Sequence, residues 1–263
     1  MNAQKIILES TSGTFNLPGT YTATKSISLS SQGGIFNSNV SGTLTSPHLR
    51  VESTAGSIGI DAANRFNPGV GIAAIEAIST VSDVFLAGPN IKTFTISGGF
   101  AQDTFDYLGA GSTTVTGDIT AQALTAGDKI SLAIATGKLN ISGGVTLFSQ
   151  RDLQLLVTAP TALAKKSSIL IGKDVEIITS SSITGDILIS VGDPGAPVAG
   201  VKPANVSTIQ LAGSSIFFGT FGLKAKSPTN SLFAQGGANI TFNNPVGSKN
   251  ISLGGGVVMV GSE

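Results

Sequence analysis

The stretch GDKISLAIATGKLNISGGVTLF, residues 127–148, decides the fold class, because it carries one short pattern twice. Gly127-Asp128 and Gly137-Lys138 each precede positions that alternate between apolar and polar side chains. A similar pattern returns in GKDVEIITSSSITGDILISV, residues 172–191. Successive side chains of a strand point to opposite faces, so this alternation predicts strands with one buried face. A pattern repeated at such short range predicts a stack of similar β units.

Segments of the form apolar-x-apolar recur along the whole chain and give the size of the unit. Their first apolar residues are Ile6, Ile27, Leu49, Ile130, Leu153, Ile169, Ile187, Ile209 and Ile251. Where successive segments are clear they lie 16 to 23 residues apart, and the longer gaps leave room for further units. So short a unit cannot bury an apolar face alone, whereas stacked units bury a continuous core. We therefore predict one all-β domain over residues 1–263, a right-handed parallel β-solenoid (β-helix) of about 12 rungs.

A pair of immunoglobulin-like sandwiches is the main alternative, since it also consists of many short strands. Such sandwiches usually carry a Trp or Tyr anchor, whereas this chain has no Trp and 2 Tyr. Charged residues make up only 11% of the chain. Ser, Thr and Asn can stack in ladders without the repulsion of stacked charges, so this composition also favours the solenoid.

Composition also excludes several classes of function. The 15 basic and 15 acidic residues balance, and no basic stripe is present, which argues against a nucleic-acid partner. The absence of cysteine excludes disulfides, zinc–thiolate sites and thiol nucleophiles. No apolar run approaches the roughly 18 residues of a membrane span. The first residues, MNAQKIILESTSGTF, show no signal peptide.

Two stretches interrupt the repeat and are predicted to be loop insertions. VGDPGAPVAGVKPANV, residues 191–206, has three prolines, which cannot donate to a strand ladder. NRFNPGVGIAAIEAIST, residues 64–80, has a helix-like composition and is predicted to form a short helix or a capping insertion. Loops that leave a rigid scaffold often carry binding residues, so specificity is expected there.

The segment TGDITAQALTAGDKISLAIATGKLNISGG, residues 116–144, resembles the repeats of filamentous-haemagglutinin-like bacterial adhesins. That resemblance implies a secreted right-handed β-helix that serves in adhesion and biofilm contact. The family's secretion domain carries an Asn-Pro-Asn motif, and FNPGV at 66–70 lacks the second Asn, so that role is not transferred. GGIFNSN at 33–39 and GGANITFNN at 236–244 are similar to tetrapeptide repeats of chlamydial autotransporters. Both resemblances imply an extracellular β-helical surface protein.

Candidate catalytic groups are few. Polysaccharide-active β-helices act through clustered carboxylates, and the closest such cluster here is Asp103, Asp106 and Tyr107 in AQDTFDYLG. Asp174 and Glu176 are a second pair, on one face of a strand by alternation. Turn capping and a solvated strand face are the structural explanations for these two sets. No metal site and no cofactor are predicted.

Three further motifs have weak functional interpretations. GVGIAA at 69–74 has the spacing of a dinucleotide loop but lacks the preceding strand that this loop needs. His48 is the single histidine, so a Ser-His-Asp triad would depend on it. Thr-x-Thr occurs in YTATK, KTFTI and GTLTS, and ice binding would need these pairs at one position on successive rungs.

The ends of a solenoid present unpaired strand edges, which invite polymerisation unless they are capped. The predicted assembly edges are apolar and β-prone, and they comprise Ile6, Ile7, Leu8, Ile251, Leu253, Val257, Val258 and Val260. The leading hypothesis is a non-enzymatic extracellular or bacterial cell-surface solenoid, structural or adhesive, that assembles head to tail into fibres. Its expected partners are itself or a host or cell-surface glycan or protein. The alternative is a carbohydrate-binding or carbohydrate-cleaving β-helix of the tailspike or lyase type.

Overall fold

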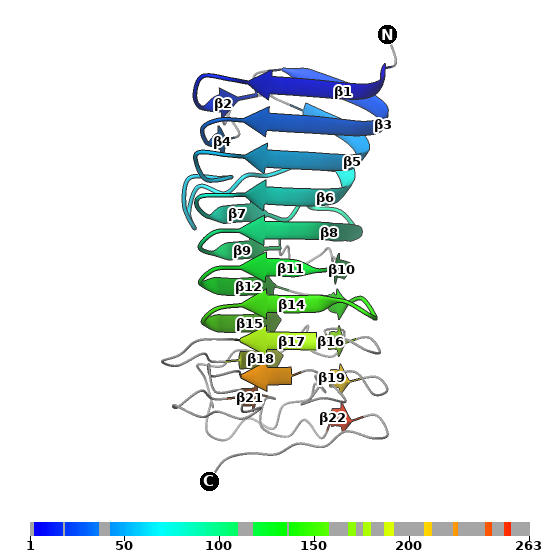
Figure 1. The fold of residues 1–263 in the computed structure, drawn as a ribbon. Helices are drawn as coiled ribbons and strands as arrows, with labels where there is room; N and C mark the ends of the chain where they lie inside the picture. Colours follow the sequence, from blue (N-terminus) through cyan, green and yellow to red (C-terminus); the bar gives the residue numbers. More distant parts are fainter. Residues whose placement is uncertain are drawn as a thin grey trace.

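The computed structural model is all-β, and no helix occurs in the residues that it describes. Those residues are 3–17, 19–36, 43–109, 118–135, 137–157, 168–171, 176–179, 187–191, 208–211, 223–225, 240–243 and 250–253. The backbone winds into coils that stack along one axis, with β1 and β22 at opposite ends of the stack (Figure 1). Every strand pairing in the described part of the chain is parallel, which is the arrangement of a β-solenoid.

One long wall of the solenoid is a 14-stranded sheet. Its main path runs through β1 (Ala3–Ser10), β3 (Thr20–Ser31), β5 (Thr43–Ser53), β6 (Gly71–Ser79), β8 (Thr93–Ala101), β10 (Asp118–Ala121), β13 (Lys138–Ile141), β16 (Ser168–Ile171), β19 (Thr208–Leu211) and β22 (Asn250–Leu253). The wall is extended below the second half of β8 by β11 (Leu124–Ala126), β14 (Thr146–Ser149), β17 (Glu176–Thr179) and β20 (Leu223–Ala225).

The second wall is a six-stranded sheet that continues upward through isolated bridges. Its strands are β7 (Val84–Ala87), β9 (Phe105–Leu108), β12 (Lys129–Ile134), β15 (Asp152–Val157), β18 (Ile187–Val191) and β21 (Ile240–Asn243). The short pair β2 (Phe15–Asn16) and β4 (Ile35–Phe36) lies above it. Bridges from Ile35 to Ile58 and from Ile58 to Val84 join this pair to the wall. Both walls therefore run through the same stack of coils.

The solenoid has about six turns in which both walls carry a described strand. The predicted number of about 12 rungs is not confirmed. That number assumed similar spacing throughout, but in the second wall Leu153 pairs with Ile187 and Ile187 with Ile240, 34 and 53 residues further on. Fewer coils fit into a chain whose coils are lengthened by such connections. The right-handed sense of winding stays a prediction.

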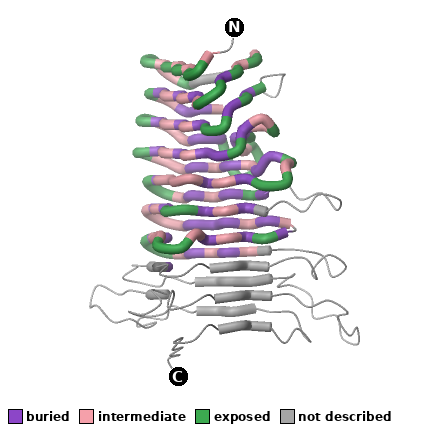
Figure 2. Tube along the Cα trace, turned by 90° about the vertical axis from the view of Figure 1, so that its right-hand side faces the viewer, coloured by how far each residue is buried: buried purple, intermediate pink, exposed green. Residues whose placement is uncertain are grey.

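The core is built from columns of inward-facing apolar side chains. Ile27, Leu49, Ile75 and Ile96 stack directly on one another, and none is more than 2% exposed. Along much of β3 and β5, buried residues alternate with more exposed ones, as the sequence pattern predicted (Figure 2). Each Å² of apolar surface that this stacking removes from water stabilises the fold by about 25 cal/mol, and this burial is the main stabilising contribution in such a fold.

Buried serines form hydrogen bonds with the turns, or corners, that follow strands of the first wall. Ser31, Ser53 and Ser79 share one column, and the hydroxyl of each donates to a glycine carbonyl in the coil above: Gly13 at 2.7 Å, Gly33, and Gly56 at 2.9 Å, respectively. The same oxygens accept backbone N–H groups from the turns that follow. Each of these serine hydroxyls therefore links the turn that follows its own strand to the corner of the coil above.

Gly127, which opens the repeated pattern, is needed for the close approach of two coils. Its N–H donates to the Ala101 carbonyl at 3.1 Å. A Cβ at this position would overlap the carbonyl oxygen of Gln102 in the coil above. The recurrent glycine therefore reflects backbone packing between coils at this corner.

The structure differs from the prediction over residues 64–80. Residues 71–79 are β6, a regular strand of the first wall, and not a helix or an insertion. Its alternating buried residues stack on β5 and β8, and this tertiary packing outweighs the helix-like composition. The chain leaves the stack earlier, between Ile58 and Phe66. Ile58 bridges Val84 and Phe66 bridges Leu86, so these two residues occupy neighbouring inward positions of the second wall. Of the predicted loop 191–206, Val191 ends β18 and the rest lies outside the described residues.

Candidate functional site

The structure does not bring Asp103, Asp106 and Tyr107 together as a site. Tyr107 points into the core, is 0% exposed, and stacks on Phe94 with ring centroids 6.1 Å apart and an interplanar angle of 14°. Burial raises the pKa of its phenol. Asp103 is exposed in the turn before β9, whereas Asp106 lies on the outer face of that strand. Tyr107 therefore does not share a surface with the two carboxylates.

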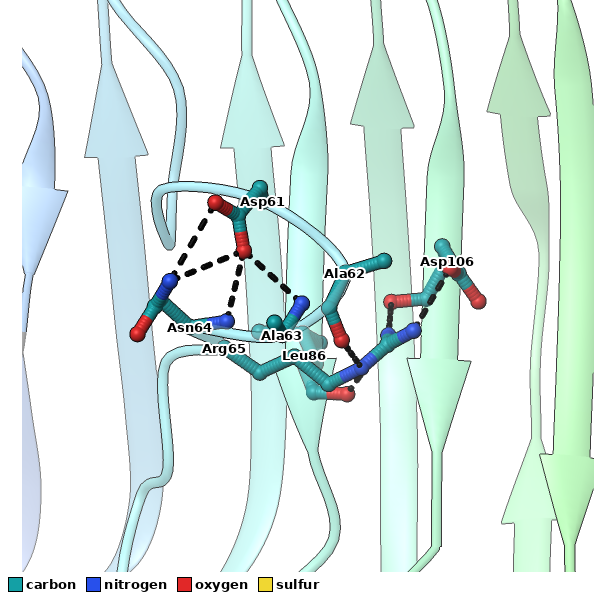
Figure 3. A network of polar contacts seen from close by, with 7 residues as sticks. All are labelled: Asp61, Ala62, Ala63, Asn64, Arg65, Leu86 and Asp106. Carbon is teal, nitrogen blue, oxygen red and sulfur yellow. Dashed lines mark hydrogen bonds and ion pairs between the residues drawn. The ribbon is translucent and has the colours of Figure 1, made fainter.

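Asp106 is occupied by an ion pair with Arg65 (Figure 3). Arg65 Nη2 lies 2.7 Å from Asp106 Oδ2, and the two side chains are only 11% and 18% exposed. Arg65 Nη1 also donates to the backbone carbonyls of Asp106, at 3.1 Å, and Leu86, at 3.4 Å. The guanidinium therefore neutralises the carboxylate and fastens residues 59–66 to β7 and β9.

The same loop is closed by Asp61. Asp61 Oδ1 accepts the N–H groups of Ala63 and Asn64 at 2.8 and 2.7 Å, and the Asn64 side-chain amide at 3.1 Å (Figure 3). These hydrogen bonds, that from the Asn64 N–H above all, lower the pKa of Asp61. Gly59, at φ +76°, lets the chain leave the wall without strain. The loop is thus held at both ends, with Ile60 exposed at its start.

The structure places His48 and most of GVGIAA in strands of the first wall, and it does not test the pair of Asp174 and Glu176. Gly71–Ala74 of GVGIAA lies in β6, so it does not open a helix that could hold a phosphate. His48 is exposed on β5, between Ser26 and Ala74 of the neighbouring strands. Asp174 lies outside the described residues, and only the backbone of Glu176 is described. Within the described part of the chain, no three His, Cys, Asp or Glu residues are grouped for a metal.

The outer face of the first wall carries paired charges. Arg50 of β5 donates to Glu52 of the same strand at 3.0 Å and to Glu76 of β6. The hydrogen bond to Glu76 is the main cause that raises the pKa of Arg50. The net charge of these three residues is −1, and they present no strongly charged binding surface.

Threonines of two coils stack in register. Thr20 and Thr22 of β3 pair with Thr43 and Thr45 of β5, and all four side chains are exposed. In the next coil Gly71 stands opposite Thr45, so the array ends after two coils. Such an array lacks the successive rungs that ice binding would need.

The clearest functional feature is the open edge of β1. Among the described strands β1 pairs only with β3. Its inward residues Ile6 and Leu8 are only partly buried, although Ile27 and Leu29 beneath them are 0% exposed. The first coil is accordingly more exposed than the coils below it (Figure 2). Ile6 and Leu8 are thus less covered than the inward residues directly beneath them.

The backbone of this edge is also free to pair. The N–H of Gln32 donates to the carbonyl of Ser10 at 3.0 Å, so Ser10 directs its backbone groups toward β3 and its coil. Peptide groups alternate along a strand, so Ile6 and Leu8 point the same way, and Ile7 points toward the open edge. The Ile7 side chain itself is 65% exposed on the outer face. Within the part of the chain that the structure describes, β1 therefore presents backbone groups without a strand partner together with apolar side chains.

The opposite end of the wall is β22, which pairs only with β19 among the described strands. It contains the predicted edge residues Ile251 and Leu253, whose backbone alone is described. Val257, Val258 and Val260 lie outside the described residues. The sequence predicts both strands as assembly edges from their apolar, β-prone residues, and their part in assembly stays a prediction. Sequence reasoning missed Arg65, which is 41 residues from Asp106 and has no local signal.

Comparisons with protein-family models, curated proteins and solved structures found no match for this chain. Among the described residues, no helix is long and apolar enough to cross a membrane. Fold and site geometry therefore carry the functional inference.

Proposed function

We propose that this chain is a non-enzymatic structural or adhesive β-solenoid of the cell exterior, whose copies stack head to tail into fibres. The observation that supports stacking is the open edge of β1, where Ile6 and Leu8 are half-buried over a fully buried column. A parallel strand placed on this edge buries both side chains and pairs the free backbone groups of the edge. The proposed extracellular site rests on the resemblance of the repeats to surface adhesins.

A structural role is further supported by how the candidate catalytic groups are used. Tyr107 packs in the core, and Asp106 holds the loop at 59–66 through Arg65. These side chains contribute to the stability of the rod. The alternative, a carbohydrate-cleaving β-helix, would need carboxylates free to reach a substrate from one groove.

Substitution of Ile7 by proline tests the stacking proposal. The Ile7 N–H faces the open edge, so proline there removes a hydrogen bond to a stacked copy without removing one to β3. We expect Ile7→Pro to abolish filaments in electron micrographs taken over a concentration series. Ile7→Ala is the matched control, because it removes the same exposed side chain but keeps the N–H, and it should still assemble.

Two outcomes would contradict the proposal. The first is that the unaltered protein stays as single short rods at every concentration. The second is that Ile7→Pro assembles as well as Ile7→Ala, while both variants keep the circular dichroism and unfolding midpoint of the parent. In either case β1 is not an assembly edge.

A further inference from the structure

The columns of the first wall specify how one copy meets the next. We infer that β22, the last strand of the wall among those the structure describes, lies on β1 of the following copy, with Leu253 opposite Ile6 and Ser252 opposite Lys5. This inference rests on the proposed stacking and deepens it by naming the partner strand and its register.

Two columns run the whole length of the wall and end in these residues. The first column of register partners runs from Ile6 through Ile27, Leu49, Ile75, Ile96, Ala121, Ile141, Ile171 and Leu211 to Leu253. The adjacent column from Lys5 passes through Ser26, His48, Ala74, Thr95, Thr120, Asn140, Leu170 and Gln210 to Ser252. One further step of the same kind leads from Leu253 to Ile6, and from Ser252 to Lys5, of a second copy.

The backbone hydrogen bonds agree with this register. Inside the solenoid Ala121 pairs with Ile141, and its carbonyl accepts the N–H of the following residue, Ser142, at 2.9 Å. The same step at the joint directs the Leu253 carbonyl to the N–H of Ile7, the residue after Ile6. That N–H is the one that β1 turns toward its open edge.

Charge and side-chain alternation favour the same partner. β22 contains no charged residue, so Lys5 meets no like charge in the joint. A shift of one residue would place inward positions of one strand opposite outward positions of the other, which would expose the apolar set. The nearest register that keeps the faces is a shift of two, with Ser252 opposite Ile7, and an experiment must distinguish these two.

Cysteine cross-linking can do so because the chain has no cysteine of its own. In-register Cα atoms of neighbouring strands lie about 4.8 Å apart, within the range of a disulfide. A two-residue shift increases that separation to about 8 Å, beyond the range. The two ends of the ten-strand path are separated by nine steps, roughly 43 Å, so any link must join two copies.

The test compares three variants under mild oxidation on non-reducing gels. Lys5→Cys with Ser252→Cys should give a ladder of dimers, trimers and longer species. Ile7→Cys with Ser252→Cys is the matched control for the shifted register and should stay monomeric. Lys5→Cys alone should also stay monomeric on the gel. This single variant can form a disulfide-linked dimer only if the β1 edges of two copies meet head to head.

A charge series gives a second measurement without cross-links. Ser252→Glu places a carboxylate opposite Lys5 and should lower the critical concentration for assembly by about two- to fivefold, whereas Ser252→Lys should raise it by a similar factor. Adding Lys5→Glu to each variant should reverse the order of the two. An order that does not reverse means that residues 5 and 252 are not opposite each other.

The outcomes separate this inference from the proposal on which it rests. Cross-linking through Ile7→Cys instead of Lys5→Cys, or through both equally, overturns the register but leaves the fibre proposal intact. Dimers of Lys5→Cys alone overturn the head-to-tail direction. Absence of filaments in the unaltered protein overturns the proposed function, and the named joint with it.

Discussion

Tyr107 is a polar side chain placed where the core needs an apolar one. Its hydroxyl is fully buried and has no hydrogen-bond partner among the described residues. A buried hydroxyl without a partner costs roughly 1–3 kcal/mol. The ring nevertheless stacks on Phe94, so the aromatic surface is what this position uses. Tyr107 therefore stabilises the solenoid through its ring, while its hydroxyl detracts from stability.

We expect Tyr107→Phe to increase the free energy of unfolding by about 1 kcal/mol at neutral pH, because it removes only the unpaired hydroxyl. The advantage should grow as the pH rises above about 10, where tyrosine ionises in the unfolded chain but stays protonated in the core. Denaturant unfolding at pH 7 and at pH 10–11 measures both effects. Tyr21→Phe is the control, since Tyr21 is only partly buried. Destabilisation by Tyr107→Phe at neutral pH would mean that the hydroxyl has a partner.

At the scale of the element, the serine column shows how one small residue holds a corner. Ser79 Oγ donates to Gly56 O at 2.9 Å and accepts the N–H of Ser82 at 3.2 Å. Lower coils have Ala101 and Ala126 in the same column, so alanine fits the space.

We expect Ser79→Ala to lower the free energy of unfolding by about 1–2 kcal/mol, through hydrogen bonding alone. Ser30→Ala, on the outer face of β3, should change it by less than about 0.5 kcal/mol. Equal effects in calorimetry would refute a special role for the corner.

The loop at 59–66 depends on one ion pair. Replacing Arg65 by methionine leaves the Asp106 carboxylate mostly buried and unpaired, so we expect a loss of about 1–3 kcal/mol and faster amide exchange in residues 60–65. Arg50→Met is the matched control, because the Arg50 side chain is 42% exposed and its ion pairs contribute at most about 1 kcal/mol. Combining Arg65→Met with Asp106→Asn should recover part of the loss. Unchanged exchange in the loop would show that Asp61 alone closes it.

For the whole molecule, the alternation of apolar residues predicted the fold class, because the coils whose side chains are described bury the same face. The number of rungs could not be predicted, since connections such as that from Ile187 to Ile240 vary in length without changing the strand pattern. Alternation also places Tyr107 on the same side of β9 as the buried Phe105, a sign that it faces the core. The serine corner has a partial sequence signal: STAG and STVS begin at Ser53 and Ser79, and STSG begins at Ser10 of the same column, whereas Ser31 begins SQGG. The Arg65–Asp106 pair has none, because only the stacking of coils brings these residues together.

The mass per unit length of the proposed fibre follows from the stack itself. Each copy of 26.4 kDa contributes the ten described strands of the main path of the first wall, which corresponds to about 48 Å of axial length. A single head-to-tail stack should therefore contain about 0.55 kDa per Å, with strands perpendicular to the fibre axis and a meridional reflection near 4.8 Å. Scanning transmission electron microscopy of unstained fibres measures the first quantity, and fibre diffraction measures the second. Twice that mass per length would indicate two rods side by side. Strands parallel to the axis would refute stacking through β1, because continuing the solenoid across the joint requires the strand spacing to run along the fibre.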